Sequence, residues 1–312
     1  MSPSREMALN RAQLLRRNDE WVRACLASPH ALAVLVADGK VLASEDGSRP
    51  VFVPLGWLGE RMTTADPVVL LGTRNDTAYV AVGLGEAWVP PVMAKDGRWV
   101  ELRQMGALFH TWEGEVLGCA RALVYWHTHN RFCGICGAAT ESAQGGSVRM
   151  CTNGSCGKFH FPRTDPAVIV LVSAGEECLL ARQRIWVPGR YSAVAGFVEP
   201  AESCEHAAAR EVEEETGILV EDVRYRFSQG WPFPRSLMIA FRARAVGRDI
   251  TVDTDELEDA RWLSREQIEE GLMSGRLSLP PVFAAGFRLV EEWFDEGGSR
   301  LRDLVTRPVA GG

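Results

Sequence analysis

Apolar positions in residues 1 to about 125 come in short runs separated by turn-forming residues. The stretches "ALAVLVADGKVLAS" and "PVVLLGTRNDTAYVAVGL" contain runs of strand length, whereas "ELRQMGALF" and "CARALVYWH" repeat their apolar residues at helical spacing. This pattern predicts an α+β domain with an antiparallel sheet over residues 1–130. It contains no catalytic motif.

The pattern changes twice after this region. Residues 131–161 are rich in cysteine and glycine and have almost no apolar periodicity, so burial alone cannot fold them. From "PAVIVLV" onward, strand patterns at "CLLAR", "LMIAFRARAV" and "ARWL" alternate with a helix over 204–216 and a C-terminal helix over roughly 281–297. The chain therefore reads as three domains, with the last over residues 162–312.

Composition narrows the class of protein. The 312 residues are 46% hydrophobic and 24% charged, with a formal net charge of -7, which argues against a broad basic surface for nucleic acid. An acidic protein that acts on a phosphorylated substrate needs a divalent metal ion as mediator. The first residues carry charges throughout, unlike a secretory signal, and the apolar runs are too short to span a membrane. A cytoplasmic enzyme is expected.

Four of the eight cysteines form a compact motif. Cys133 and Cys136 are separated by two residues, and Cys151 and Cys156 follow with four residues between them. Glycines in both turns allow the backbone to fold around a tetrahedral ion, so the motif predicts a structural zinc site with a full ligand shell. The alternatives are free thiols or two disulfides. The nearby His127 and His129 are interpreted as packing or surface residues.

A helix rich in glutamate follows. Ser203 can cap its start and Gly217 can end it in the left-handed conformation. Glu211, Glu214 and Glu215 then share one face, and their mutual repulsion would be offset by divalent cations. The alternative, a solvated acidic face, is the better interpretation for an arbitrary glutamate-rich helix.

The spacing around this helix decides between these interpretations. Its fixed positions are Gly196, Glu202, Arg210-Glu211, the aliphatic Val212, Glu214-Glu215, Gly217 and the aliphatic Ile218. This set resembles the complete signature of the Nudix hydrolases. The resemblance implies an α/β/α sandwich with a mixed sheet, behind the N-terminal α+β domain and the zinc ribbon. It also implies hydrolysis of a nucleoside diphosphate linked to another group.

The resemblance also assigns roles. Glu211, Glu215, the carbonyl of Ala195 and the downstream acid Glu256 would hold Mg2+ or Mn2+; the alternative for Glu256 is an exposed acid of a turn. Glu202 and Arg210 would form an orienting ion pair. Glu215 is expected to lie closest to the attacking water, with Glu214 as the second candidate.

Substrate specificity has to come from outside this signature. The zinc segment, the linking "FPRTDPAVIVLV" and the later "SQGWPFPRS" together are similar to the NADH pyrophosphatase branch of the family. That resemblance implies that the substrate is bound by Arg103, Phe161, Phe197, Gln229, Trp231, Pro232, Phe233, Pro234, Ser236 and Gly286. Gly230 departs from the branch, which has proline there, so the pocket wall is expected to be looser.

The predicted activity is hydrolysis of the pyrophosphate bond of NADH and NAD+ to AMP and nicotinamide mononucleotide. One alternative is removal of the NAD cap from RNA by the same chemistry. The other is a non-catalytic dinucleotide-binding regulator, against which the intact glutamate set argues. The resemblance further implies a homodimer, and no membrane partner is expected.

Overall fold

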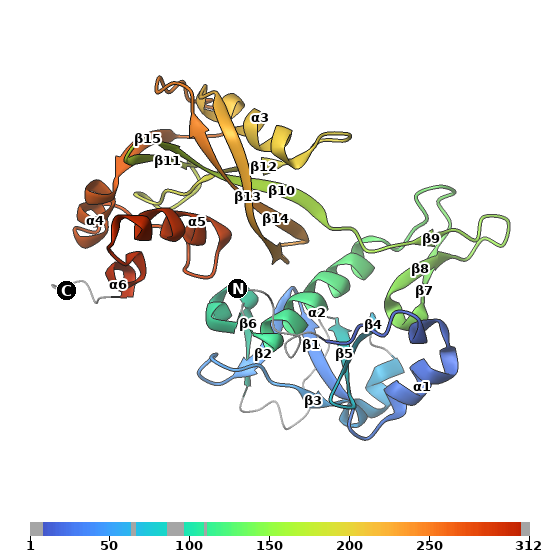
Figure 1. Ribbon diagram of the computed structural model, residues 1–312. Coiled ribbons are helices and arrows are strands. Elements are labelled where there is room, and N and C mark those ends of the chain that lie inside the picture. The colour runs from blue at the N-terminus through green and yellow to red at the C-terminus, as the bar shows by residue number, and fades with distance from the viewer. Residues whose placement is uncertain (1–8, 64–66, 86–96, 109–110, 307–312) are drawn as a thin grey trace. The chain divides into compact units, whose positions relative to one another are not determined.

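A computed structural model describes residues 9–63, 67–85, 97–108 and 111–306 of the chain, which forms two compact units (Figure 1). The first unit comprises Met1–Arg163 together with Pro232–Arg235. The second comprises Thr164–Trp231 and Ser236–Gly312. No helix within the described ranges combines the length and the apolar character needed to cross a membrane.

A mixed six-stranded sheet forms the centre of the first unit, in the order β4-β5-β1-β2-β6 with β3 paired to β1. Its strands are β1 (Leu32–Ala37), β2 (Lys40–Ser44), β3 (Val53–Pro54), β4 (Val68–Arg74), β5 (Thr77–Leu84) and β6 (Gly97–Glu101). The hairpins β1-β2 and β4-β5 are antiparallel, but β1 and β5 run parallel. The expectation of an antiparallel sheet is therefore wrong at this pair, because apolar alternation marks each strand without specifying how two hairpins join.

Apolar clusters cover both faces of this sheet. Helix α2 (Trp112–His129) packs on one face, where Leu117 joins the cluster that contains Val34. Helix α1 (Asp19–Ala27) lies on the other face, beside the cluster that contains Leu35. Successive residues of β1 alternate between the two clusters, as the period of a strand requires. Short 3-10 helices complete the unit, namely η1 (Leu15–Arg17), η2 (Leu55–Thr63), η4 (Leu102–Leu108) and η5 (Gln144–Gly146).

A small three-stranded antiparallel sheet follows α2 within the first unit. Its strands are β7 (Thr140–Ala143), β8 (Val148–Cys151) and β9 (Phe159–His160). His127 at the end of α2 is buried and bonds through Nε2 to the carbonyl of Gly146, while its Nδ1 lies 2.9 Å from Nη1 of Arg149. Since arginine can only donate, His127 accepts at Nδ1 and donates at Nε2. These bonds confirm the packing interpretation of His127.

A second mixed sheet forms the centre of the second unit, in the order β13-β14-β10-β11-β15 with β12 paired to β10. Its strands are β10 (Asp165–Ala174), β11 (Glu177–Arg182), β12 (Val194–Phe197), β13 (Val220–Trp231), β14 (Ser236–Ala245) and β15 (Asp259–Ser264). Strands β10 and β14 are parallel and the other pairs are antiparallel. The sheet is therefore mixed, as the family resemblance implied.

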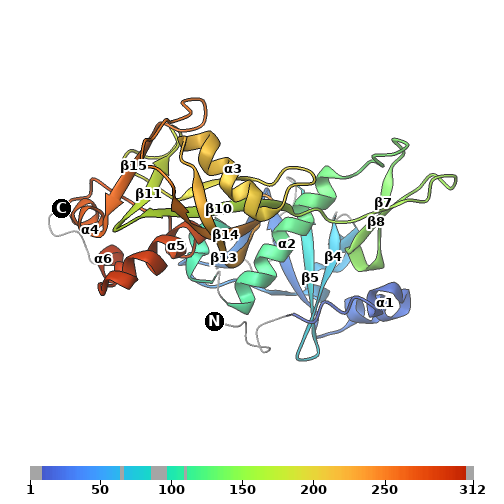
Figure 2. The ribbon, with the colours of Figure 1, turned by 45° about the horizontal axis from the view of Figure 1, so that its top comes forward.

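Helices lie on both faces of this second sheet (Figures 1 and 2). Helix α3 (Cys204–Thr216) packs through Val212 against one face, and α5 (Ala285–Phe294) packs through Phe287 against the other. Helix α4 (Arg265–Met273), η6 (Asp295–Gly297) and α6 (Leu301–Thr306) complete the unit. The result is the α/β/α sandwich implied by the resemblance.

The C-terminal helix is shorter than the predicted 281–297, and the segment 228–236 is divided between the two units. The C-terminal helix begins only at Ala285, because residues 281–284 form a turn in which the Ala284 amide bonds to the Pro281 carbonyl. The segment 228–236 is mostly strand. Residues through Trp231 belong to β13, and Ser236 begins β14, so only Pro232–Arg235 form the connecting turn.

Candidate functional site

Helix α3 has the ends that its sequence predicts. The Ser203 side chain accepts a hydrogen bond from the His206 amide, and Gly217 adopts a left-handed conformation with φ 69° while its amide bonds to the Glu213 carbonyl. With both ends fixed, the apolar side of the helix faces the sheet. Glu211 and Glu215 lie at the edge of this apolar side. Their residues are only 8% and 4% exposed. Two carboxylates are thus held side by side and largely out of water.

The Glu211 carboxylate occupies the space left by a glycine on the neighbouring strand. A Cβ atom at Gly196 would collide with the Glu211 carboxylate, so a larger residue at this position would displace the end of the Glu211 side chain. Gly196 belongs to β12, which is fixed to β10 through pairs such as Ala195 with Ile169. The carbonyl predicted as a metal ligand, that of Ala195, therefore belongs to the residue next to the one that contacts Glu211.

Arg210 connects most of the remaining acids. Its guanidinium donates to both carboxylate oxygens of Glu202, at 2.8 and 2.9 Å, and to the carbonyl of Phe197 at 2.9 Å. It also donates to Glu211 at 3.0 Å and to Glu214 at 2.8 Å. The Arg210 guanidinium lowers the pKa of Glu202 to about 2, whereas the pKa of Arg210 itself is raised by its bonds to Glu202. This network fixes the start of α3 relative to β12.

Glu215 has a different environment. Burial raises its pKa to about 8, and the charges of Glu211, Glu256, Asp253 and Glu214 add to this rise. Burial also raises the pKa of Glu211, although Arg210 acts in the opposite direction. Within the described residues, no basic side chain forms an ion pair with Glu215. A bound divalent cation would compensate this excess of negative charge.

The acidic turn at 253–256 is tied directly to the end of α3, because the Asp253 amide donates to the Glu215 carbonyl at 3.0 Å. Glu256 is thereby close enough to influence the pKa of Glu215, but both Asp253 and Glu256 are exposed. The carboxylate oxygens of Glu215, Asp253 and Glu256 are not gathered into a compact metal site. In the described ranges, only the four cysteines bring three or more potential ligand atoms within 4.8 Å of one another. The sequence did not single out Asp253 as part of the site.

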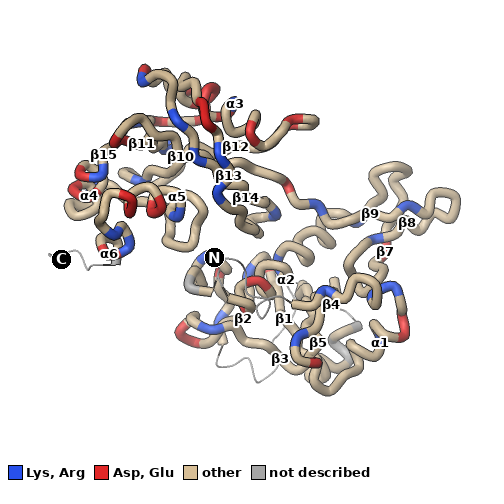
Figure 3. Tube along the Cα trace, in the orientation of Figure 1, with Lys and Arg blue, Asp and Glu red and all other residues tan. Residues whose placement is uncertain are grey.

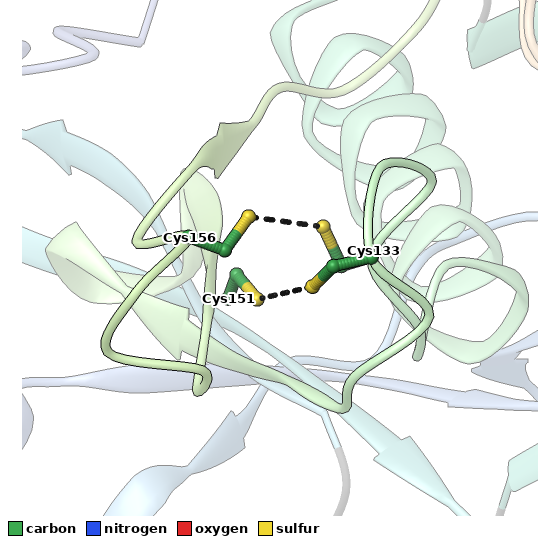
Figure 4. A group of neighbouring side chains, drawn as sticks. Cys133, Cys151 and Cys156 are labelled. Atoms are coloured by element: carbon green, nitrogen blue, oxygen red, sulfur yellow. Dashed lines mark hydrogen bonds between the residues drawn. The ribbon is translucent and has the colours of Figure 1, made fainter.

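The cysteine motif folds into a compact cluster of four sulfur atoms (Figure 4). The Sγ atoms of Cys133 and Cys156 lie 3.9 Å apart, and those of Cys136 and Cys151 lie 3.4 Å apart. Sulfurs around a tetrahedral zinc are separated by about 3.8 Å, given Zn–S bonds of about 2.3 Å. The four thiols therefore fit zinc, and none is in a disulfide.

The contacts around Cys133 favour its ionised form. The backbone amides of Cys136 and Ile135 lower the pKa of Cys133 to about 6. Burial instead raises the pKa of Cys151 to about 12, so a bound cation is needed before Cys151 can ionise. His160 Nε2 lies 3.2 Å from Cys133 Sγ, a contact that the cysteine spacing could not reveal. The exposed His129 lies outside the cluster, as expected.

The predicted substrate residues fall into separate groups. In the second unit, Gln229 Nε2 donates to the Phe283 carbonyl at 2.6 Å, and the Trp231 ring stacks on the Phe283 ring with centroids 6.2 Å apart. Phe197 is exposed at the end of β12, and Ser236 begins β14. Phe283 was missed because nothing in its local sequence marks it.

Gly286 lies buried in the first turn of α5, where a Cβ would collide with Ser192 Oγ. Close packing within the second unit therefore accounts for this glycine. Gly230 differs, because it has no left-handed φ and no heavy atom lies within 4 Å of where its Cβ would be. Neither conformation nor space requires glycine at position 230.

The remaining predicted substrate residues belong to the first unit. Phe233 packs at the edge of the α2 cluster, with the guanidinium carbons of Arg103 and Arg121 over its ring at 4.5 and 4.9 Å. Arg121 also donates to the Pro232 carbonyl. Pro234 completes the same turn, whereas Phe161 is exposed after β9. Arg103 and Phe233 thus contact each other, and Arg121 was not foreseen.

Three family models match the chain in succession. They are described as NADH pyrophosphatase-like rudimentary NUDIX domain, over residues 30–126, NADH pyrophosphatase zinc ribbon domain, over 129–161, and NUDIX domain, over 163–282.

Among similar proteins, the NAD-capped RNA hydrolase NudC of Deinococcus radiodurans is 37% identical over 278 residues, which cover 85% of this chain and 88% of that protein. The NAD-capped RNA hydrolase NUDT12 of Homo sapiens is 42% identical over 58% of this chain. The chain spans only 42% of the human protein's length, and about half, 51%, of Nudix hydrolase 19, chloroplastic, of Arabidopsis thaliana. A crystal structure of a NUDIX hydrolase from Nitrosomonas europaea matches with 20% identity and a TM-score of 0.44, over 55% of this chain and 94% of that one.

Proposed function

The chain belongs to the Nudix hydrolases, in the NADH pyrophosphatase branch, and from this premise we propose that it hydrolyses the pyrophosphate bond of NADH and NAD+. The products are AMP and the nicotinamide mononucleotide. The observation that most supports this proposal is the buried pair Glu211 and Glu215, held at the end of α3 with a large excess of negative charge. Such a site favours a divalent cation and, through it, a diphosphate.

Mg2+ or Mn2+ would be held by Glu211, Glu215, Glu256 and the carbonyl of Ala195. The chemistry that this cation supplies when bound is neutralisation of the diphosphate oxygens and acidification of a water molecule. Because Glu211 and Glu215 are held by the fold before substrate arrives, they need little rearrangement to bind. Carboxylate oxygens suit both ions, and the choice between them is left to the assay below.

Glu215 is proposed as the group that accepts the proton of the attacking water. The water oxygen forms a bond to one phosphorus, the bridging P–O bond breaks, and a nucleoside monophosphate leaves. Glu214 is less suited to this role because it is exposed and bonded to Arg210. Arg210 and Glu202 would position α3 against β12 rather than contact the reacting atoms.

The substrate's rings are proposed to stack on Phe161, Phe197 and Trp231, while Gln229 and Ser236 supply polar contacts. Arg103, Gly286 and the turn Pro232 to Pro234 are kept as proposed substrate residues on the strength of the family resemblance. Trp231 is stacked on Phe283, which would hold its ring in one orientation. A stacked pair of this kind is a suitable platform for a flat substrate ring.

Removal of the NAD cap from RNA is the second candidate function. It is favoured by the similarity to NudC and NUDT12, which are named as NAD-capped RNA hydrolases. The same carboxylates would act on the same bond, so the two candidates differ only in whether the adenosine of NAD is joined to an RNA chain. A non-catalytic regulator would have no use for the two buried glutamates.

We also propose domain limits of 1–130, 131–161 and 162–312, with zinc as the ion that stabilises the middle domain. A homodimer is expected from the resemblance, and light scattering coupled to size exclusion would test it. A reducing compartment such as the cytoplasm suits four thiols that bind metal.

The decisive experiment is a substrate panel. The purified protein is incubated with NADH, NAD+, other dinucleotides and NAD-capped RNA, under Mg2+ and under Mn2+, and products are identified by mass. AMP and reduced nicotinamide mononucleotide from NADH support the first candidate. A strong preference for capped RNA supports the second, and turnover of neither would refute both.

A further inference from the structure

Large apolar side chains are exposed in the zinc-binding part of the first unit. Phe132 is 71% exposed, Ile135 is 70% exposed and Phe159 is 47% exposed, and all lie within 27 residues of one another. Single exposed apolar residues are ordinary, but a group of them on one small segment is typical of a binding surface. The zinc cysteines do not need these rings, because the four sulfurs lie together on their own.

The local geometry turns Phe159 away from the metal cluster. His160 points to Cys133, with 3.2 Å between Nε2 and Sγ. Because side chains alternate along an extended chain, Phe159 and Phe161 lie on the side opposite to His160. Phe159 also follows Lys158, so an aromatic and a cationic side chain are adjacent in the sequence.

The charge of this segment is opposite to that of the whole chain. Residues 131–163 contain four basic residues and one acidic residue, a formal charge of +3, whereas the whole chain carries -7. Arg149 is buried, which leaves Arg131, Lys158 and Arg163 exposed, against Glu141. Figure 3 shows several blue positions, which mark Lys and Arg, in the part of the chain around β7, β8 and β9. The exposed apolar side chains therefore belong to a segment whose charge is mainly positive.

We propose that this surface binds the single-stranded RNA chain of a capped substrate. The surface, here called the ribbon surface, consists of Arg131, Phe132, Ile135, Lys158, Phe159 and Arg163. Aromatic rings that stack with bases, interleaved with cations that neutralise phosphates, are how proteins bind single strands without reading sequence. A homodimer contact fits less well, because cores of such contacts are depleted of charged residues.

The inference rests on the proposed function through Phe161. Phe161 follows Phe159 by two residues in the chain. If Phe161 stacks on a ring of the NAD cap, the RNA attached to that cap starts near Phe159. The following nucleotides can then contact the aromatic and cationic residues of the ribbon surface. Free NAD+ has no such chain, so the ribbon surface should distinguish capped RNA from the free dinucleotide.

The test compares these two substrates. The double variant Phe132→Ala/Phe159→Ala and the single variant Lys158→Glu are assayed on NAD+ and on NAD-capped RNA with a single-stranded tail. Trp57→Ala and Arg23→Glu serve as matched controls, because Trp57 is in the first unit and is also 47% exposed, and Arg23 is an exposed cation of α1. Zinc content, melting temperature and oligomeric state are measured for every variant.

The ribbon variants should lower kcat/KM for capped RNA by about tenfold or more, the loss expected from one stacked base. Their kcat/KM for NAD+ should stay within about twofold of the original protein. Lys158→Glu should also flatten the dependence of RNA binding on salt, by about 0.7 in the logarithmic slope for each phosphate that the protein no longer neutralises. Equal losses on both substrates, or a change in oligomeric state that accounts for the loss, would overturn the proposal.

A binding measurement separates this inference from the proposed function. Fluorescence anisotropy with single-stranded RNA that bears a 5′ monophosphate requires no turnover. If the protein cleaves neither substrate but binds this RNA, and the ribbon variants lose that binding, the surface stands and the proposed function fails. If cleavage of NADH is observed while RNA binding is the same in original and variant proteins, the surface is refuted and the function stands.

Discussion

Replacing Glu215 with glutamine should stabilise the protein in the absence of divalent cations while abolishing its turnover. Burial raises the pKa of Glu215 to about 8, from an ordinary value of 4.5. At pH 7, about 2.5 units above that ordinary value, keeping the proton costs the folded state about 3 kcal/mol, at about 1.4 kcal/mol per unit. Glutamine is neutral in both states and avoids this cost.

The sign of the pH dependence follows from the same shift. A carboxyl whose pKa is raised by folding binds more protons in the folded state between pH 4.5 and 8. The original protein should therefore lose stability as pH rises through this window, and the advantage of Glu215→Gln should grow from pH 5 to pH 8. Saturating Mg2+ should make the original protein more stable than Glu215→Gln, because only the original protein keeps its full set of carboxylate ligands.

Urea unfolding in buffers stripped of Mg2+ and Mn2+, with zinc content verified, provides the measurement. Glu213→Gln is the matched control, since Glu213 is exposed on the same helix, and its effect should stay within about 0.5 kcal/mol. A Glu215→Gln protein that is less stable than the original at pH 8 without cations would refute the electrostatic account. Near-normal turnover by it would refute the assignment of Glu215 to the metal site.

Three further changes test other parts of the structure. Removing zinc with a chelator and then adding excess Mg2+ should lower the melting temperature, because the four-cysteine segment lacks an apolar core, and an unchanged melting temperature with proven zinc loss would contradict this. Gly196→Ala should displace the Glu211 carboxylate, so turnover should fall at least tenfold while far-UV circular dichroism is retained, and normal turnover would contradict the contact. Gly230→Ala should raise the free energy of unfolding by about 0.4–1 kcal/mol, because its φ and surroundings accept a Cβ, and a loss of stability in urea unfolding would contradict this.

Local signals in the sequence predicted the parts of the site that depend on one helix. Ser203 and Gly217 give the ends of α3 correctly because capping is determined by neighbouring backbone groups. The cysteine spacing likewise predicts the sulfur cluster, since each pair lies in one turn. Each cap and each cysteine pair involves residues close in the chain, although the two pairs themselves meet across 15 to 23 residues.

Contacts between distant segments could not be predicted in this way. Asp253 reaches the end of α3 through a backbone bond to Glu215, and Phe283 meets Trp231 from a segment about 50 residues away. Phe233 was expected at the substrate, and the structure packs it beside Arg103 and Arg121. Such pairings depend on how sheets and helices assemble, which apolar periodicity does not encode.

The most direct test of the central claim is hydrolysis of NADH in water enriched in oxygen-18, with Mg2+ or Mn2+, followed by mass spectrometry. Attack by water on the pyrophosphate bond predicts equal amounts of AMP and reduced nicotinamide mononucleotide, with one heavy oxygen in one of the two products. Glu215→Gln run in parallel should yield neither. Release of inorganic phosphate, or absence of AMP from NADH, would contradict the account.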